Sequence, residues 1–244
     1  MNNLPLILFL LFIVAFFYAT VGHGGASGYI AMLTLLGIST SLIKPSALLL
    51  NIFVASVSYY HYYKSGYFKW RLFYPFAILS VPMAYAGSFI VLDPTWYKRI
   101  LGFCLLIAIL RIVGVFTKKE NDEIKQVPLV TGLIIGAALG FLSGMIGIGG
   151  GIILSPIILL FNWGNLKETS AVSALFIVVN SIAGMIGLFK QQINLPSQVF
   201  LWVAVALVGG FLGAFWGSKK ATNTTLRNVL AAVLLFAAFK LIFI

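Results

Sequence analysis

The chain has 244 residues, of which 61% are hydrophobic and 9% are charged, and its mean hydropathy is +1.07. A soluble domain carries about a quarter charged residues, so this composition excludes an ordinary soluble protein. The net charge of +11 is in keeping with the basic cytoplasmic loops of membrane proteins, and we expect no nucleic-acid partner. The single cysteine, Cys104, excludes an internal disulfide and CxxC chemistry, and we expect neither a metal nor a cofactor.

The first apolar segment, residues 4–37, is too long for one membrane crossing and is interrupted by GHGGASG (22–28). As one straight helix it would extend ~50 Å, against the ~30 Å of the hydrocarbon core. The part after the glycines has only about ten residues, which are too few to span. We therefore expect either a re-entrant hairpin or a crossing helix followed by a half-helix. The segment lacks the basic residues that open a signal peptide, so we treat it as part of the mature protein.

The rest of the chain contains regular apolar stretches and a second broken segment. Each stretch reaches the ~20 residues that a helix needs to cross the hydrocarbon core. We expect transmembrane helices over 43–63, 72–92, 97–116, 168–189, 197–217 and 225–244, a second broken element over 127–161, and a charged cytoplasmic linker over 117–126. The predicted fold is an all-α polytopic membrane protein, a multi-pass protein of the inner (plasma) membrane.

The two halves of the chain resemble each other. The stretch GHGG (22–25) aligns with GIGG (147–150) at an offset of 125, and matching residues continue downstream at a slowly drifting offset. Such an offset is typical of a duplicated unit. We therefore predict two homologous repeats, 1–116 and 127–244.

The basic residues indicate how the repeats are oriented, because lysine and arginine concentrate in short cytoplasmic loops. A plain eight-crossing arrangement divides the 16 basic residues 9 to 7, which favours neither orientation. If each broken element enters and leaves the membrane on one side, the division becomes 11 inside and 5 outside. We therefore predict an inverted second repeat, with both termini external.

The two glycine-rich breaks form the candidate binding site. Non-helical backbone at membrane depth is stable only inside protein or beside water, and broken helices of inverted repeats often meet around a transported substrate. Each short limb begins after its break, and its free N–H groups and partial positive charge suit an anion. We expect Ser27 to be the N-cap residue of the first limb. The candidate substrate-binding residues are Gly22, His23, Gly24, Gly25, Ala26 and Ser27 in the first break, Gly147, Gly149, Gly150, Gly151 and Ile152 in the second, and Asn51, Ser173 and Asn180 on the helices that follow.

Several of these residues have alternative interpretations. Glycines can simply permit close helix packing, which suits the isolated pair Gly209 and Gly213 better than it suits a cluster. Asn51 and Asn180 either contact the substrate or tie helices together, since a mid-membrane asparagine needs a partner. His23 either donates to an anion, carries a coupled proton, or bonds a carbonyl of its own hairpin.

The acidic residues narrow the class of substrate. All five, Asp93, Glu120, Asp122, Glu123 and Glu168, lie in predicted loops or at helix ends. Cation pumps and antiporters usually place a carboxylate inside the membrane, so cation transport is disfavoured and an anion or neutral solute is preferred.

The pattern of breaks and helices resembles the TauE/SafE sulfite exporters, also called toluene sulfonate uptake permeases, over nearly the whole chain. The stretch GIGGGIILSPIILL (147–160) is similar to the family pattern, and SAVSALFIVVNS (170–181) is similar to the start of its next helix. The first repeat departs from the pattern at His23 and Ala26 and lacks the following proline. The resemblance implies transport, frequently export, of sulfite, sulfonates or related small anions. The expected partners are this substrate and the lipid bilayer, with a coupling proton and a homodimer left open.

One enzymatic alternative comes from GASG (25–28), which matches the GxSG motif of intramembrane serine proteases. Ser27 would be the nucleophile and His61 its base. The second break keeps the glycines and lacks this serine, and His61 lies in the tyrosine-rich run YYHYYK (59–64), which is typical of a membrane interface. We therefore expect a transporter and not an enzyme.

Overall fold

The computed structural model describes residues 4–90, 124–191 and 195–243, and all regular structure within these ranges is helical. The prediction of an all-α fold is therefore confirmed. The predicted helix 97–116 and most of the linker 117–126 lie outside the described residues. The helices are α1 (Leu4–Thr20), α2 (Ala26–Leu35), α3 (Thr40–Lys64), α4 (Trp70–Ser88), α6 (Leu129–Ile146), α7 (Gly151–Leu160), α8 (Leu166–Lys190), α9 (Gln198–Lys219) and α10 (Asn223–Phe243).

Among the described helices, four are long and apolar enough to cross a membrane, which makes the chain a multi-pass membrane protein. They are Ser41–Lys64, Leu129–Ile146, Leu166–Lys190 and Gln198–Lys219. The predicted crossings 72–92 and 225–244 correspond to helices α4 and α10. These two helices are not among the four that meet the length and hydropathy expected of a membrane span. In α4, the polar Arg71 and the prolines Pro75 and Pro82 lower the hydropathy.

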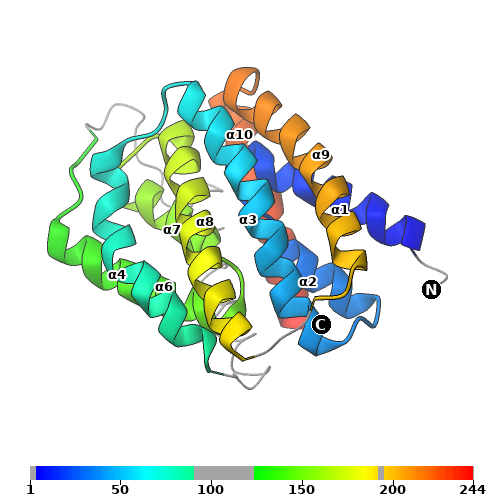
Figure 1. The fold of residues 1–244 in the computed structure, drawn as a ribbon. Coiled ribbons are helices and arrows are strands. Elements are labelled where there is room, and N and C mark those ends of the chain that lie inside the picture. The colour runs from blue at the N-terminus through cyan, green and yellow to red at the C-terminus, as the bar shows by residue number, and fades with distance from the viewer. Residues whose placement is uncertain (1–3, 91–123, 192–194, 244) are drawn as a thin grey trace.

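The long helices lie side by side, with α3 and α8 in the middle of the molecule (Figure 1). On one side α4 packs against α6 and α8, and on the other α9 packs against α1 and α3. The short helices α2 and α7 contact α3 and α8, respectively. At 1.5 Å per residue, each ten-residue helix is about 15 Å long, which is half of a typical hydrocarbon core.

The two central helices run in opposite directions. The lysine near the start of α3, Lys44, donates from Nζ to the Ser88 carbonyl at the end of α4 (3.3 Å), and Gln191 after α8 donates to the same carbonyl (3.2 Å). At the other end, Lys167 at the start of α8 donates to the Ser218 carbonyl of α9 (3.4 Å). Lys167 also donates to Tyr67 Oη (3.2 Å), just after α3. The start of each central helix therefore lies beside the end of the other.

Glycines bring the outer helices into backbone contact. On α6, a Cβ on Gly140 would collide with the Ser80 carbonyl of α4. On α9, a Cβ on Gly213 would collide with the Phe16 carbonyl of α1. In membranes, where no hydrophobic force drives helices together, the van der Waals packing that such close approach permits is one of the forces that hold helices together. The packing interpretation of Gly213 is therefore confirmed.

We predict that Gly213→Ala destabilises the protein, because the new methyl group must push α9 away from the α1 backbone. Overpacking of this kind costs roughly 1–3 kcal/mol of unfolding free energy, which thermal unfolding in detergent measures. The control is Gly184→Ala in α8, where the nearest atom to a new Cβ is Leu48 Cδ1 at 3.5 Å. Equal losses in the two variants would contradict the close-packing role of Gly213.

Candidate functional site

The first break turns the chain back through glycines in left-handed backbone conformations. After α1 ends at Thr20, Gly22 has a φ of 76° and Gly25 a φ of 95°. Gly25 is the N-cap residue of α2, which begins at Ala26. The expectation that Ser27 caps this helix is wrong, because Ser27 already lies inside the first turn. Its Oγ instead lies 2.8 Å from Tyr18 Oη on α1.

The second break has the same construction. Helix α6 ends at Ile146, and Gly147, Gly149 and Gly150 have φ values of 85°, 75° and 74°. Gly150 is the N-cap residue of α7 and, like Gly25, adopts a left-handed conformation. An L-residue rarely adopts such angles, so a side chain at these glycines would strain the backbone.

Neither short helix has a side-chain cap from its N-cap residue. Long helix α8 has a capping box in which Asn165 and Glu168 each accept from the other's backbone N–H, whereas the N-cap residues of α3, α4, α6 and α9 likewise make no side-chain cap. In α2 one of the first amides, that of Ala26, donates to Asn51 Oδ1 on α3 (3.0 Å). The short helices therefore begin in buried surroundings with N–H groups that no N-cap side chain satisfies.

His23 brings the two breaks into contact. Its Nε2 lies 3.2 Å from the Gly151 carbonyl and 3.1 Å from Ser155 Oγ, both on α7, and its Nδ1 lies 2.9 Å from the Val21 carbonyl. With the proton on Nδ1 the ring donates to Val21 and accepts from Ser155, whereas the other tautomer donates to Gly151. The His23 side chain is 1% exposed, so this bridge between the first break and the start of α7 is fully buried.

Asn51 lies between the breaks at the middle of α3. Its Oδ1 accepts from Ala26, whereas its Nδ2 is buried and has no hydrogen-bond partner among the described residues. A Cβ placed on Gly149 would lie 2.9 Å from this Nδ2 and 3.0 Å from Ser181 Oγ of α8. Ser181 Oγ is likewise buried without a partner in the described part of the chain. Buried unpaired polar atoms are costly, so these two groups are candidates for binding a polar ligand or water.

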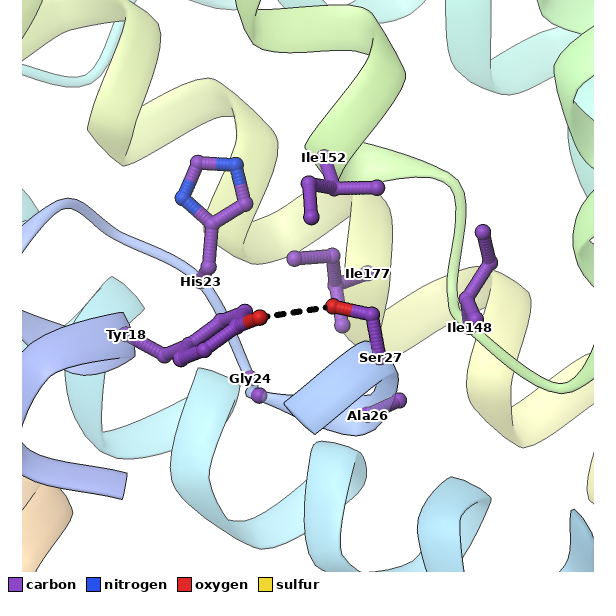
Figure 2. Close-up of a pocket in the computed structure, with 9 residues that line it drawn as sticks. Tyr18, His23, Gly24, Ala26, Ser27, Ile148, Ile152 and Ile177 are labelled. Carbon is purple, nitrogen blue, oxygen red and sulfur yellow. Dashed lines mark hydrogen bonds between the residues drawn. The ribbon is translucent and has the colours of Figure 1, made fainter. Parts of the chain in front are cut away.

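A small cavity lies at the meeting point (Figure 2). Its volume of about 10 Å³ is enough for roughly one water molecule. Figure 2 shows the Tyr18 and Ser27 hydroxyls joined by their hydrogen bond, with His23, Ile152, Ile177 and Ile148 around the same space. Among the described residues, no charged side chain lines this cavity. The described part of the chain also has no group of three or more His, Cys, Asp or Glu residues that could hold a metal ion. The lining residues are Tyr18, His23, Gly24, Gly25, Ala26, Ser27, Ile148, Ile152 and Ile177.

The other candidate residues lie around the cavity without lining it. Gly22 packs on the backbone of Ser170 at the start of α8, and Gly147 packs on Lys44 near the start of α3. Ser173 Oγ lies 2.8 Å from Ser155 Oγ. The side-chain amide of Asn180 bonds within its own helix, α8, where Nδ2 donates to the Phe176 carbonyl (2.9 Å).

The structure gives no support to a Ser27–His61 dyad. The Ser27 hydroxyl pairs with Tyr18, and His61 packs edge-on against Phe211 and Phe215 of α9. His61 Nε2 has no hydrogen-bond partner among the described residues. Along α3, His61 lies about 15 Å from Asn51, the residue that binds the start of α2.

Two polar residues of the site were missed from the sequence. Tyr18 lies in the apolar helix α1 and Ser155 in the short apolar helix α7, and each contacts the first break only through tertiary packing. The available signal was the isolation of Ser155 in the apolar run of α7, since a polar side chain there is expected to face the protein interior.

We predict that Tyr18 and Ser27 are energetically coupled through their hydroxyl pair. In a double-mutant cycle of Tyr18→Phe and Ser27→Ala, the coupling in unfolding free energy should be about 0.5–1.5 kcal/mol. Ser56→Ala is the control partner, because Ser56 Oγ donates to the Ile52 carbonyl of its own helix (2.5 Å) and should not couple to Tyr18. Additive losses for Tyr18 and Ser27 would contradict the hydrogen bond.

Comparisons with known proteins place this architecture in a family. The model of the family described as "Sulfite exporter TauE/SafE" matches residues 7–241. The chain is 38% identical to the "Probable membrane transporter protein y4hK" of Sinorhizobium fredii, over 95% of each chain. It is 27% identical to the "Probable membrane transporter protein YdhB" of Bacillus subtilis, over 94% of each chain. No solved structure matches the chain. The chain therefore belongs to the TauE/SafE sulfite exporter family of membrane transporters.

Proposed function

We propose that the protein is a secondary transporter of the inner membrane that exports a small anion such as sulfite, a sulfonate or a related oxyanion. The anion binds between the two glycine-rich breaks, near the middle of the membrane. The observation that carries this proposal is the meeting of α2 and α7, which begin at left-handed glycines without side-chain caps and are joined across His23. Packing alone does not account for two helices that begin at left-handed glycines inside the protein without a side-chain cap from their own N-cap residues.

Two helix starts can provide the positive potential that an anion needs. Each helix N-terminus acts as roughly +0.5 of an elementary charge, and its free N–H groups donate hydrogen bonds. The surroundings are buried, so these partial charges act with less screening than at a water-exposed helix end. The proposed site therefore binds an anion without a buried lysine or arginine. Asn51 Nδ2 and Ser181 Oγ lie beside Gly149, outside the lining of the cavity, and are two donors that have no partner in the described residues.

We also propose that the two halves are repeats of opposite orientation. The antiparallel course of α3 and α8 supports this arrangement, because these helices occupy corresponding places in the two halves. The outer contacts support it as well: α4 of the first half packs on α6 of the second, and α9 of the second packs on α1 of the first. Transport would then follow from a movement of one half against the other around the site between them.

The test of the site uses two glycines that the helix starts require. Gly25→Val and Gly150→Val should each reduce anion binding by at least about tenfold, because a side chain forces the left-handed backbone to change and moves the donors. Binding of sulfite and methanesulfonate to the purified protein is measured by calorimetry, and monodisperse elution reports folding. The matched control is Gly37→Val, since Gly37 has a φ of 71° with no atom within 4 Å of a new Cβ. Unchanged binding in both site variants would overturn the proposed site.

The proposed orientation predicts which loops are accessible from outside the cell. In a Cys104→Ser background, cysteine at Lys125 should react only after permeabilisation, whereas cysteine at Lys190 should react in intact cells. This follows from the excess of basic residues on the Lys125 side. Labelling with a membrane-impermeant maleimide measures both positions. The reverse pattern would contradict the orientation, with the linker 117–126 inside and both termini outside.

A further inference from the structure

A second, larger cavity lies at the end of the molecule where α4, α6 and α8 begin. Its volume is about 570 Å³, which is in the range of small-molecule binding pockets. It is lined by residues within 69–74 at the start of α4, by 124–127 directly before α6, and by Trp163 and Glu168 on either side of the first residue of α8. This second cavity shares no lining residue of the described chain with the cavity between the breaks.

The three helix starts meet at the second cavity because of how the helices pack. Helices α4 and α6 lie side by side (Figure 1). Near their starts Gly132 of α6 packs against Pro75 of α4, and near their ends Gly144 packs against Ala84, so the two helices run in the same direction. The start of α8 lines the same cavity. Each helix start acts as roughly +0.5 of an elementary charge, so the three together give the second cavity a positive potential.

Basic side chains add to this potential. Lys69, Arg71 and Lys125 line the second cavity, and all three are exposed. Glu168 is the only acidic side chain of the described residues that lines it, and its carboxylate accepts from the Asn165 backbone N–H (3.2 Å) as part of the helix cap. Three cations therefore face one carboxylate. This excess of positive charge suits a phosphate group, whose several oxygens can accept from lysine and arginine donors together.

The position of the second cavity favours a lipid as the source of this phosphate. Helix α6 is long and apolar enough to cross a membrane, and the cavity lies directly before its first residue, where the headgroups of a bilayer lie. Exposed apolar side chains follow on both helices, at Tyr74 and Ile78 of α4 and at Val130 and Ile134 of α6. A phospholipid covers such a surface with its acyl chains, whereas a soluble phosphate compound leaves it uncovered.

We propose that the second cavity binds the phosphate group of an anionic phospholipid. The headgroup lies among Lys69, Arg71 and Lys125, and the acyl chains lie along the exposed apolar side chains of α4 and α6. Because α4 belongs to the first half of the chain and α6 to the second, the bound lipid contacts both halves. The lipid site is separate from the proposed transport site and does not depend on which anion is transported.

Native mass spectrometry of the purified full chain with added lipid tests this site. Phosphatidylglycerol should bind at least about tenfold more tightly than phosphatidylcholine with the same acyl chains, because only the former has a net negative charge for the three cations to attract. Glycerol 3-phosphate, which carries the phosphate without acyl chains, should not displace phosphatidylglycerol at the same concentration.

Two triple variants with the same loss of charge show whether the cavity itself is responsible. The cavity variant should lose the preference for phosphatidylglycerol, and it combines Lys69→Gln, Arg71→Gln and Lys125→Gln. The control should retain the preference, and it combines Lys64→Gln, Lys219→Gln and Lys220→Gln. The control lysines are exposed, lie outside the second cavity and end helices α3 and α9 or directly follow them. They are at the same end of the bundle, because the start of α8 contacts the ends of α3 and α9 there.

Three results would overturn the proposal. Equal binding of the two lipids to the wild type would exclude a site for an anionic headgroup. Equal losses in the two triple variants would assign the preference to the general surface charge and not to the second cavity. Displacement of phosphatidylglycerol by glycerol 3-phosphate would identify a soluble phosphate compound as the ligand. If the cavity variant does not fold, Arg71→Gln alone should lower the preference by about threefold or more, and an unchanged preference in that variant would overturn the site.

Discussion

The structure depends on where the backbone N–H groups at the starts of α2 and α7 are placed. Lipid cannot accept their hydrogen bonds, so a helix that begins inside a membrane must begin inside protein. Here both starts are enclosed by the two long central helices, and Asn51 of α3 takes the first amide of α2. The pairs α4–α6 and α1–α9 then close the sides of the bundle. The arrangement of the helices is therefore the enclosure that the two broken segments require.

Glycine serves this enclosure in two different ways. Gly25 and Gly150 adopt left-handed backbone angles that let a helix begin immediately after a turn. Gly140 and Gly213 lie within helices and have no left-handed backbone angles. A glycine is required at these positions because the backbone of a neighbouring helix lies against them. Clustered glycines and glycines spaced along an apolar helix thus indicate different functions, since the former destabilise a helix and the latter let helices approach.

The sequence predicted the helices better than the contacts between them. Hydrophobic length is a local property, so the central helices were predicted to within three residues of their observed ends. The interior position of Asn51 also followed from local reasoning, because a mid-membrane amide must face protein. The cap at Ser27 was predicted wrongly, since its partner, Tyr18, lies on the preceding helix and competes for the hydroxyl. The contact of Ser155 with His23 joins residues 132 positions apart, and no local pattern indicates it.

The hydrogen bonds at the site also indicate which contacts a moving transporter must exchange. The bond between Asn51 and Ala26 lies within the first half, so it can persist while the halves move. The contacts of His23 with Gly151 and Ser155 cross from the first half to the second, so a relative movement must break them. Opening would then free the His23 ring, the Gly151 carbonyl and the Ser155 hydroxyl, of which the ring N–H and the hydroxyl can donate to the anion of the proposed site. The broken bonds are costly in a buried site unless the ligand replaces them. An anion that accepts from the freed groups would therefore offset the cost of opening, and the contact between the breaks would be restored after its release.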